Sequence, residues 1–112
     1  MAMMTGVTLV PMVGTGIGVT GRRSEGAYDE RGLIALARRA VSAEVRGEPA
    51  PSSLSGRTPA RPVFVTVEID GLVRGCRGDL RTRARSLEEE VVLAARGAAA
   101  HDPKFRPLAP GD

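Results

Sequence analysis

The feature that most constrains the fold of this chain is an Asp-Gly pair between two short runs rich in Val. In the first run, VFVTVEI at residues 63–69, Val and Ile alternate with Phe, Thr and Glu, a pattern typical of a strand with one buried face. Asp70 and Gly71 suit the two positive φ angles of a type I′ turn. The sequence therefore predicts a tight β-hairpin whose return strand is LVRGCRG, residues 72–78.

A two-residue loop determines which residues of the two strands face each other. Without a bulge, Ile69 lies opposite Leu72 and Val65 opposite Cys76, the only cysteine of the chain. Because opposed residues share a face, Cys76 is predicted on the valine side of the sheet, together with Arg74.

Two helices are predicted around the hairpin. The first has Asp29 as its N-cap and Gly47 as its stop. The second begins with a capping box, Ser86 and Glu89, and ends near His101. Each helix carries one apolar stripe at spacings of three and four, which predicts packing on a core. The stripe residues are Leu33, Leu36, Ala37, Ala40, Val41 and Val45, then Leu87, Val91, Ala94, Ala95 and Ala98.

Residues 1–27 differ in composition from the rest. They hold no charged side chain before Arg22 and are rich in Gly and Thr, so we predict a flexible leader that is neither a secretory signal nor a membrane span. GIGVTG at residues 16–21 matches the dinucleotide pattern G-x-G-x-x-G. That pattern needs a strand-turn-helix unit around it, which the sequence does not predict here.

Length and composition narrow the class of protein. A chain of 112 residues is one small domain, and a single cysteine excludes an internal disulfide or a four-cysteine zinc site. Cys76 and His101 reproduce no standard metal-ligand spacing, and no cofactor is evident. The charge of +3 rests on fifteen arginines and one lysine, a bias that GC-rich coding explains as well as selection does. Nucleic-acid binding is therefore not expected. The single cysteine fits a reducing compartment, so we expect a cytoplasmic location.

Two motifs in the chain resemble the AMMECR-type domain family. The family hairpin carries Leu-Arg-Gly-Cys-Ile-Gly, and the matching residues here are Arg74, Gly75, Cys76 and Gly78. A later family motif, Asp-Pro-Arg-Phe-Pro-Pro-Leu, is matched by Asp102, Pro103, Phe105, Pro107 and Leu108. Arg77 replaces the usual aliphatic residue of the first motif, and Arg106 a proline of the second.

The resemblance implies an α+β fold, an antiparallel sheet with helices packed on it, for residues 28–112. It also implies an incomplete domain, because family members run to nearly twice this length and place further strands after the second motif. We therefore expect the chain to be unstable alone, to form a homodimer through an open sheet edge, or to be part of a longer protein. Family members are the A component of the AmmeMemoRadiSam system, which implies Memo-type and radical-SAM proteins as partners.

The first functional hypothesis is thiol chemistry at Cys76, in an enzyme or an accessory protein of a redox or modification pathway. Arg74 and Arg77 would stabilise the thiolate, and the flanking glycines would leave a path for substrate. His101 with Asp102 would complete a Cys-His-Asp arrangement. The alternative is a buried cysteine that acts as a small hydrophobe.

The second hypothesis is a binding module without catalysis. Arginines crowd residues 74–85, opposed only by Asp79, and a basic loop of this kind can hold an anionic ligand or a protein partner. The alternative is a solvated loop. The arginines are Arg74, Arg77, Arg81, Arg83 and Arg85, and the candidate binding residues are Arg74, Gly75, Arg77 and Gly78.

Overall fold

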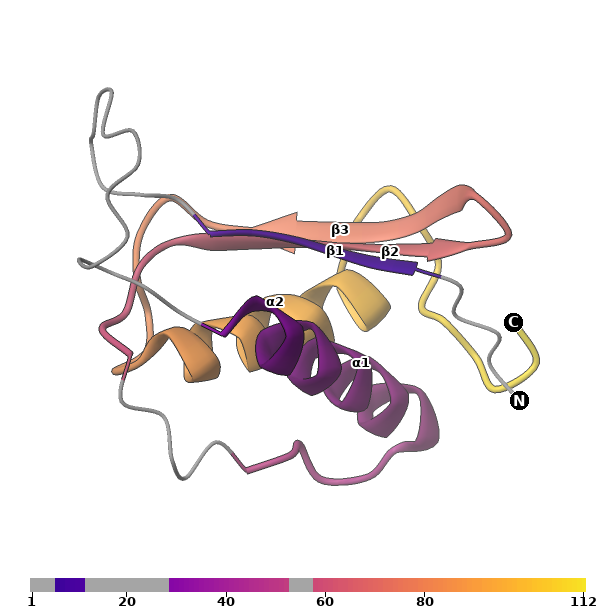
Figure 1. Cartoon of the computed structure of the whole chain (residues 1–112). Helices are drawn as coiled ribbons and strands as arrows, with labels where there is room; N and C mark the ends of the chain where they lie inside the picture. Colours follow the sequence, from indigo (N-terminus) through magenta and orange to yellow (C-terminus); the bar gives the residue numbers. More distant parts are fainter. Residues whose placement is uncertain (1–5, 12–28, 53–57) are drawn as a thin grey trace.

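The computed structural model describes residues 6–11, 29–52 and 58–112. In chain order the elements are β1 (Gly6–Pro11), α1 (Glu30–Arg46), β2 (Val63–Ile69), β3 (Leu72–Gly78) and α2 (Leu87–Ala100). The strands form one antiparallel sheet in the order β1-β2-β3, and both helices lie on the same face of it (Figure 1). The α+β fold with helices packed on an antiparallel sheet is confirmed. No helix in the described part of the chain is long and apolar enough to cross a membrane.

Strand β1 lies within residues 1–27, the segment predicted to be a flexible leader. Gly6–Pro11 pairs with β2 along its length, with Val7 opposite Val67 and Leu9 opposite Val65. The structure therefore differs from the prediction of a flexible leader. This six-residue run, which contains Val and Leu, supplies the third strand that a lone hairpin needs for stability. The GIGVTG pattern at residues 16–21 falls outside the described residues, and the domain boundary at residue 28 stays a prediction.

The hairpin turn forms as predicted. Asp70 has a φ of 53° and Gly71 a φ of 80°, the two positive angles that a type I′ turn requires. Asp70 is also the one non-glycine residue with positive φ in the described part of the chain, in keeping with the tolerance of Asp for this conformation. Ile69 pairs with Leu72, so the register is correct next to the turn.

A bulge then shifts the register by one residue. Glu68 pairs with Val73, but Val67 pairs with Gly75, so Arg74 is the extra residue of β3. Beyond the bulge Cys76 lies opposite Thr66 rather than Val65. The prediction that Cys76 shares the valine face is therefore wrong: one extra residue moves every later side chain of β3 to the other side of the sheet.

Both helices have the predicted ends. The Asp29 side chain accepts a hydrogen bond from the Gly32 N–H at 3.1 Å, and Gly47 closes α1 in the left-handed conformation with a φ of 71°. The Ser86 hydroxyl accepts from the Glu89 N–H at 3.2 Å, so α2 has its N-cap. The Glu89 carboxylate accepts from the N–H of Arg85 at 3.1 Å.

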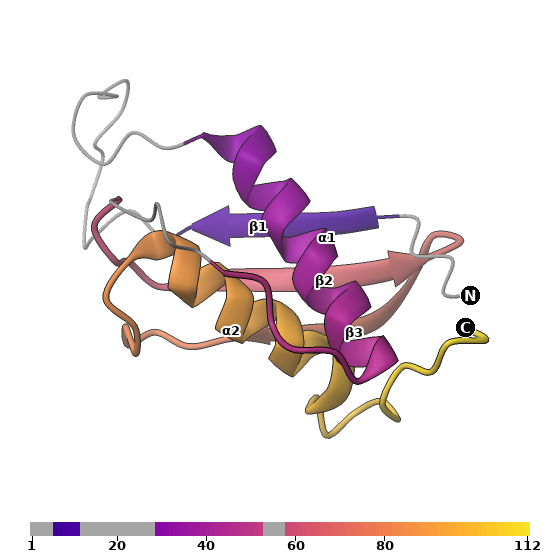
Figure 2. The same ribbon diagram turned by 90° about the horizontal axis from the view of Figure 1, so that it is seen from below.

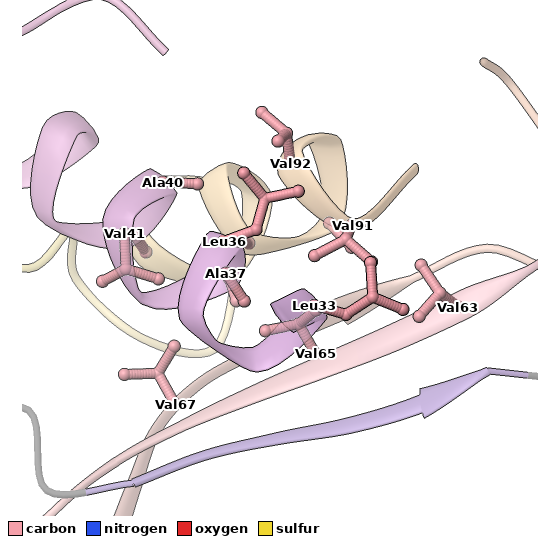
Figure 3. Close-up of a cluster of buried hydrophobic side chains, with 14 of the residues drawn as sticks. Leu33, Leu36, Ala37, Ala40, Val41, Val63, Val65, Val67, Val91 and Val92 are labelled. Carbon is pink, nitrogen blue, oxygen red and sulfur yellow. The ribbon is translucent and has the colours of Figure 1, made fainter. Parts of the chain in front are cut away.

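The core lies between the sheet and the two helices. Alternate residues of β2 are buried, and α1 crosses the helix-bearing face beside α2 (Figure 2). Leu87, Val65 and Val67 are wholly enclosed, and Leu108 joins the core from the C-terminal loop. Figure 3 labels Leu33, Leu36, Ala37, Ala40 and Val41 of α1, Val63, Val65 and Val67 of β2, and Val91 and Val92 of α2. Alanines on both helices allow close packing without aromatic side chains.

Candidate functional site

Cys76 lies on the sheet face that no described helix or strand covers (Figure 1). Its thiol is free and exposed. The hydroxyl of Thr66, the cross-strand neighbour on β2, donates a hydrogen bond to Sγ at 3.3 Å. The structure therefore corrects the alternative of a buried cysteine. It also places Thr66 beside the thiol, where the predicted register without a bulge places Val65.

Asp102 holds the backbone of Cys76. The Cys76 N–H donates to Oδ2 of Asp102 at 2.9 Å, and the Lys104 N–H donates to Oδ1 at 2.9 Å. These two hydrogen bonds, that from Lys104 first, keep the pKa of the Asp102 carboxyl below its usual range. Strand β3 is at the edge of the sheet, and in the described part of the chain no further strand pairs with its outer edge. The Asp102 carboxylate therefore accepts the Cys76 N–H that a neighbouring strand would otherwise bind. The hairpin motif and the Asp-Pro motif thus meet at one carboxylate.

Gly75 brings helix α2 directly onto β3. A Cβ atom built on Gly75 would lie 1.8 Å from the carbonyl oxygen of Ala98, so no larger residue fits without moving the backbone. The space beside Gly75 is therefore filled by the backbone of α2, on the face opposite the Cys76 side chain. Gly78 lies under the ring of Phe64, which would be 2.2 Å from an added Cβ.

Arg74 and Arg77 point to partners other than the thiol. Nη2 of Arg74 lies 3.5 Å from Oδ1 of Asp112, and Nη1 of Arg77 donates to the carbonyl oxygen of His101 at 3.1 Å. Neither guanidinium forms a hydrogen bond with Sγ of Cys76 among the described residues. Their assignment as thiolate stabilisers stays a prediction.

His101 caps the C-terminus of α2 through its backbone N–H, which donates to the Gly97 carbonyl at 2.8 Å. Its exposed side chain lines a pocket on the helix side of β3, together with Arg77. Within the described part of the chain no hydrogen bond joins the His101 imidazole to Cys76 or to Asp102. The geometry therefore gives no support to a Cys-His-Asp arrangement.

A match to a family model shows the family of the chain. The AMMECR1 family model matches residues 34–112, which include most of α1, all of α2, the hairpin and the Asp-Pro motif. This chain belongs to the AMMECR1 family. A search of the curated proteins finds no match to it.

The second motif of the AMMECR1 domain turns the chain back onto the core. The Phe105 N–H donates to the Asp102 carbonyl at 3.1 Å, and the Leu108 N–H donates to the Ala99 carbonyl at 2.8 Å. Leu108 is buried and belongs to the hydrophobic core. The sequence pattern does not reveal this burial, because a proline-rich run carries no periodic hydrophobic signal.

Asp112 is a second residue that the sequence does not single out. Its carboxylate accepts hydrogen bonds from the guanidinium of Arg106 and, at 2.6 Å, from the Ala109 N–H, and it lies beside Arg74. The hydrogen bonds from Arg106 and Ala109 hold the pKa of Asp112 far below its usual range, and the contact with Asp112 raises the pKa of Arg106. Arg106, which departs from the family motif, therefore holds Asp112 within the C-terminal loop, and the contact between Asp112 and Arg74 joins this loop to β3.

The arginines of residues 74–85 do not form one cluster. Arg74 turns to Asp112, Arg83 pairs with Asp79 at 2.8 Å, and Arg81 is exposed. Of the candidate binding residues, Arg77 and Gly78 line one pocket, whereas Arg74 and Gly75 do not. No group of three or more His, Cys, Asp and Glu side chains is placed to hold a metal ion in the described ranges.

Proposed function

We propose that this AMMECR1 domain acts through the thiol of Cys76, as a thiol-dependent enzyme or as an accessory protein of a redox or modification pathway. One observation carries the proposal. The thiol of Cys76 is exposed, and the backbone of this residue of the first family motif is hydrogen-bonded to Asp102 of the second. The β-ladder with β2 and the hydrogen bond to Asp102 restrain the Cys76 backbone from both sides. A nucleophile on a rigid element keeps its direction of attack constant.

The local chemistry suits a sulfur nucleophile. The reactive form of a cysteine is the thiolate, which accepts a hydrogen bond such as that from the Thr66 hydroxyl more strongly than a neutral thiol does. No described histidine or carboxylate side chain is hydrogen-bonded to Sγ, so the thiol proton passes to water. The sulfur lone pair then forms a bond to an electrophilic carbon or sulfur of the substrate, and the leaving group departs with the bonding electrons.

Arg74 enters the proposal as a stabiliser of negative charge on the substrate. Its side chain is 25% exposed, and its Nη2 lies 3.5 Å from Oδ1 of Asp112, longer than a direct hydrogen bond of good geometry. An anionic substrate that approaches the outer face of β3 takes the place of this weak contact.

The proposal has two further parts, the partners, which the family resemblance implies, and the compartment. Memo-type and radical-SAM proteins are the proposed partners. The cytoplasm is the proposed compartment, because an exposed, unpaired thiol persists in a reducing environment.

Alkylation kinetics test the proposal. Iodoacetamide should modify Cys76 of the native chain near neutral pH at least as fast as that of the urea-unfolded chain, because the thiol is exposed and accepts a hydrogen bond. Thr66→Val should slow the native reaction about threefold and leave the unfolded reaction unchanged, in keeping with the loss of a hydrogen bond of about 0.5–1.5 kcal/mol.

Thr82→Val is the matched control, since Thr82 is an exposed threonine in the loop before α2 and should leave both rates unchanged. A native rate tenfold below the unfolded rate would contradict an accessible thiol. Equal native rates in wild type and Thr66→Val would remove Thr66 from the site.

A further inference from the structure

A pocket lies on the helix side of β3, between the end of this strand and α2. It has a volume of about 330 Å³, within the range of small-molecule sites in proteins. Arg77 pairs with Val65 in the register and projects to this side, whereas Cys76 pairs with Thr66 and projects to the other. The pocket is therefore separate from the thiol of Cys76, and it is formed where β3 and α2 run side by side (Figure 2).

The side chain of Arg77 is held across the C-terminal part of α2. An added Cβ on Gly97 would lie 2.6 Å from Cγ of Arg77, so the stem of the arginine rests directly on the helix backbone. One guanidinium nitrogen donates to the His101 carbonyl at 3.1 Å. Of the five N–H donors of a guanidinium, most remain free to bind a ligand.

The other charged groups of the pocket already have partners. Arg83 pairs with Asp79 at 2.8 Å, and Arg96 pairs with Glu44 at 2.8 Å. The Glu90 carboxylate accepts hydrogen bonds from the backbone N–H groups of Arg83 and Ala84. Among the described residues, Arg77 is thus the lining arginine that forms no ion pair with a carboxylate, although its charge contributes at longer range to the lowered pKa of Asp102.

Apolar side chains form another part of the lining. Val63 and Ala94 are buried in the core and show only an edge to the pocket, whereas Leu93 is 47% exposed. An exposed leucine beside an unpaired guanidinium suits a ligand that has an apolar body and one charged end.

We propose that this pocket binds a small organic monocarboxylate with an apolar body. The carboxylate forms charge-assisted hydrogen bonds with Arg77, and the apolar part covers Leu93 and Ala94. Arg77 supplies the positive charge for the ligand carboxylate, whereas the lining carboxylate of Glu90 is directed to the backbone N–H groups of Arg83 and Ala84. A phosphate dianion would have to displace Asp79 from Arg83 or Glu44 from Arg96, so a carboxylate is favoured.

Titration of the full chain with 3-phenylpropionate, followed by amide NMR, tests the proposal. Saturable shifts are expected at Arg77, Gly97 and His101, with weaker binding of the neutral analogue 3-phenylpropionamide. Arg77→Gln should reduce the affinity about ten- to a hundredfold, as expected for the loss of hydrogen bonds to a charged group. The variant retains Cγ over Gly97 and an amide that can donate to His101, so the fold should persist.

Arg81→Gln is the matched control, because Arg81 is an exposed arginine of the same segment that does not line the pocket. This variant should bind 3-phenylpropionate with the affinity of wild type. If Arg77→Gln fails to fold, Leu93→Glu decides, since it places a carboxylate in the lining of the pocket at a half-exposed position and should abolish binding. Cys76→Ser should bind as wild type does, which separates this site from the thiol. Absence of saturable shifts, equal binding by Arg77→Gln, or tighter binding of phenyl phosphate than of 3-phenylpropionate would overturn the proposal.

Discussion

Strands β2 and β3 belong to one hairpin and have seven residues each, but they differ in what determines their side chains' positions. In β2 burial alternates strictly, and the core takes every second residue. In β3 a bulge at Arg74 breaks the alternation, and only Gly75 is buried. Hydrophobic burial thus determines which side chains of the central strand β2 face the helices. In the edge strand β3 the bulge determines it, so that the thiol lies on one face and Arg77 on the other.

The largest expected effect is at the point where β3 meets α2. Gly75→Ala should lower the free energy of unfolding by about 3 kcal/mol or more, because the new methyl group would collide with the backbone carbonyl of Ala98 rather than with a movable side chain. Urea denaturation followed by circular dichroism measures this change. Gly111→Ala is the control, since an added Cβ there has no neighbour within 4 Å. A stable Gly75→Ala variant would show that β3 is not in contact with the helix.

A matched pair of valines compares the two strands directly. Val67→Ala in β2 should cost about 2 kcal/mol, because the side chain is fully buried and its loss removes two methyl groups and leaves a cavity. Val73→Ala in β3 should change stability by less than about 0.5 kcal/mol, since Val73 is 43% exposed. Equal costs, measured by the same denaturation, would mean that the outer face of the hairpin is covered in solution.

The smallest effect is expected from the carboxylate that anchors β3. Asp102 has a lowered pKa in the folded chain, so its contribution to stability is present above the unfolded value of 3.8 and is lost as the pH falls through the folded pKa. Asp102→Asn should therefore reduce the loss of stability between about pH 5 and pH 2 relative to wild type. Denaturation midpoints over this range measure the difference.

Leu80→Asn, at an exposed loop position 70% accessible, serves as the control for the pH series and should leave the slope unchanged. If Asp102→Asn also has the wild-type slope, the hydrogen bonds from Cys76 and Lys104 do not hold the carboxylate in solution. Asp112 and Asp79 also have lowered pKa values, so the acid slope should decrease without vanishing.

Local sequence signals predicted the elements well. Asp29, Gly47 and Ser86 act within four residues of their own position, so the caps of α1 and α2 are visible without knowledge of the fold. The turn at Asp70 and Gly71 is equally local. Strand β1 was missed because a short run among glycines has no cap or turn signal and forms only through pairing with β2.

The candidate site depended on contacts between distant residues. Sequence motifs identified Cys76 and Asp102, but neither motif shows that the Asp102 carboxylate accepts the Cys76 N–H across 26 positions of the chain. The alternation of β3 predicted the wrong face for Cys76, because the bulge at Arg74 shifts the register by one residue. The bulge lies next to Gly75, where α2 packs against the strand, and such long-range packing cannot be read from the sequence of the hairpin.

The amino-acid sequence by itself thus determined the helices, the hairpin turn, the buried face of β2 and membership of the family, since each depends on short-range patterns or on motif identity. Only the tertiary structure decided that the thiol faces outward, that Arg77 faces the pocket beside α2 and that Asp112 holds the C-terminal loop. The physical reason is the edge position of β3. Its side chains are not constrained by a surrounding core, so their directions follow from the contacts that α2 and the C-terminal loop impose.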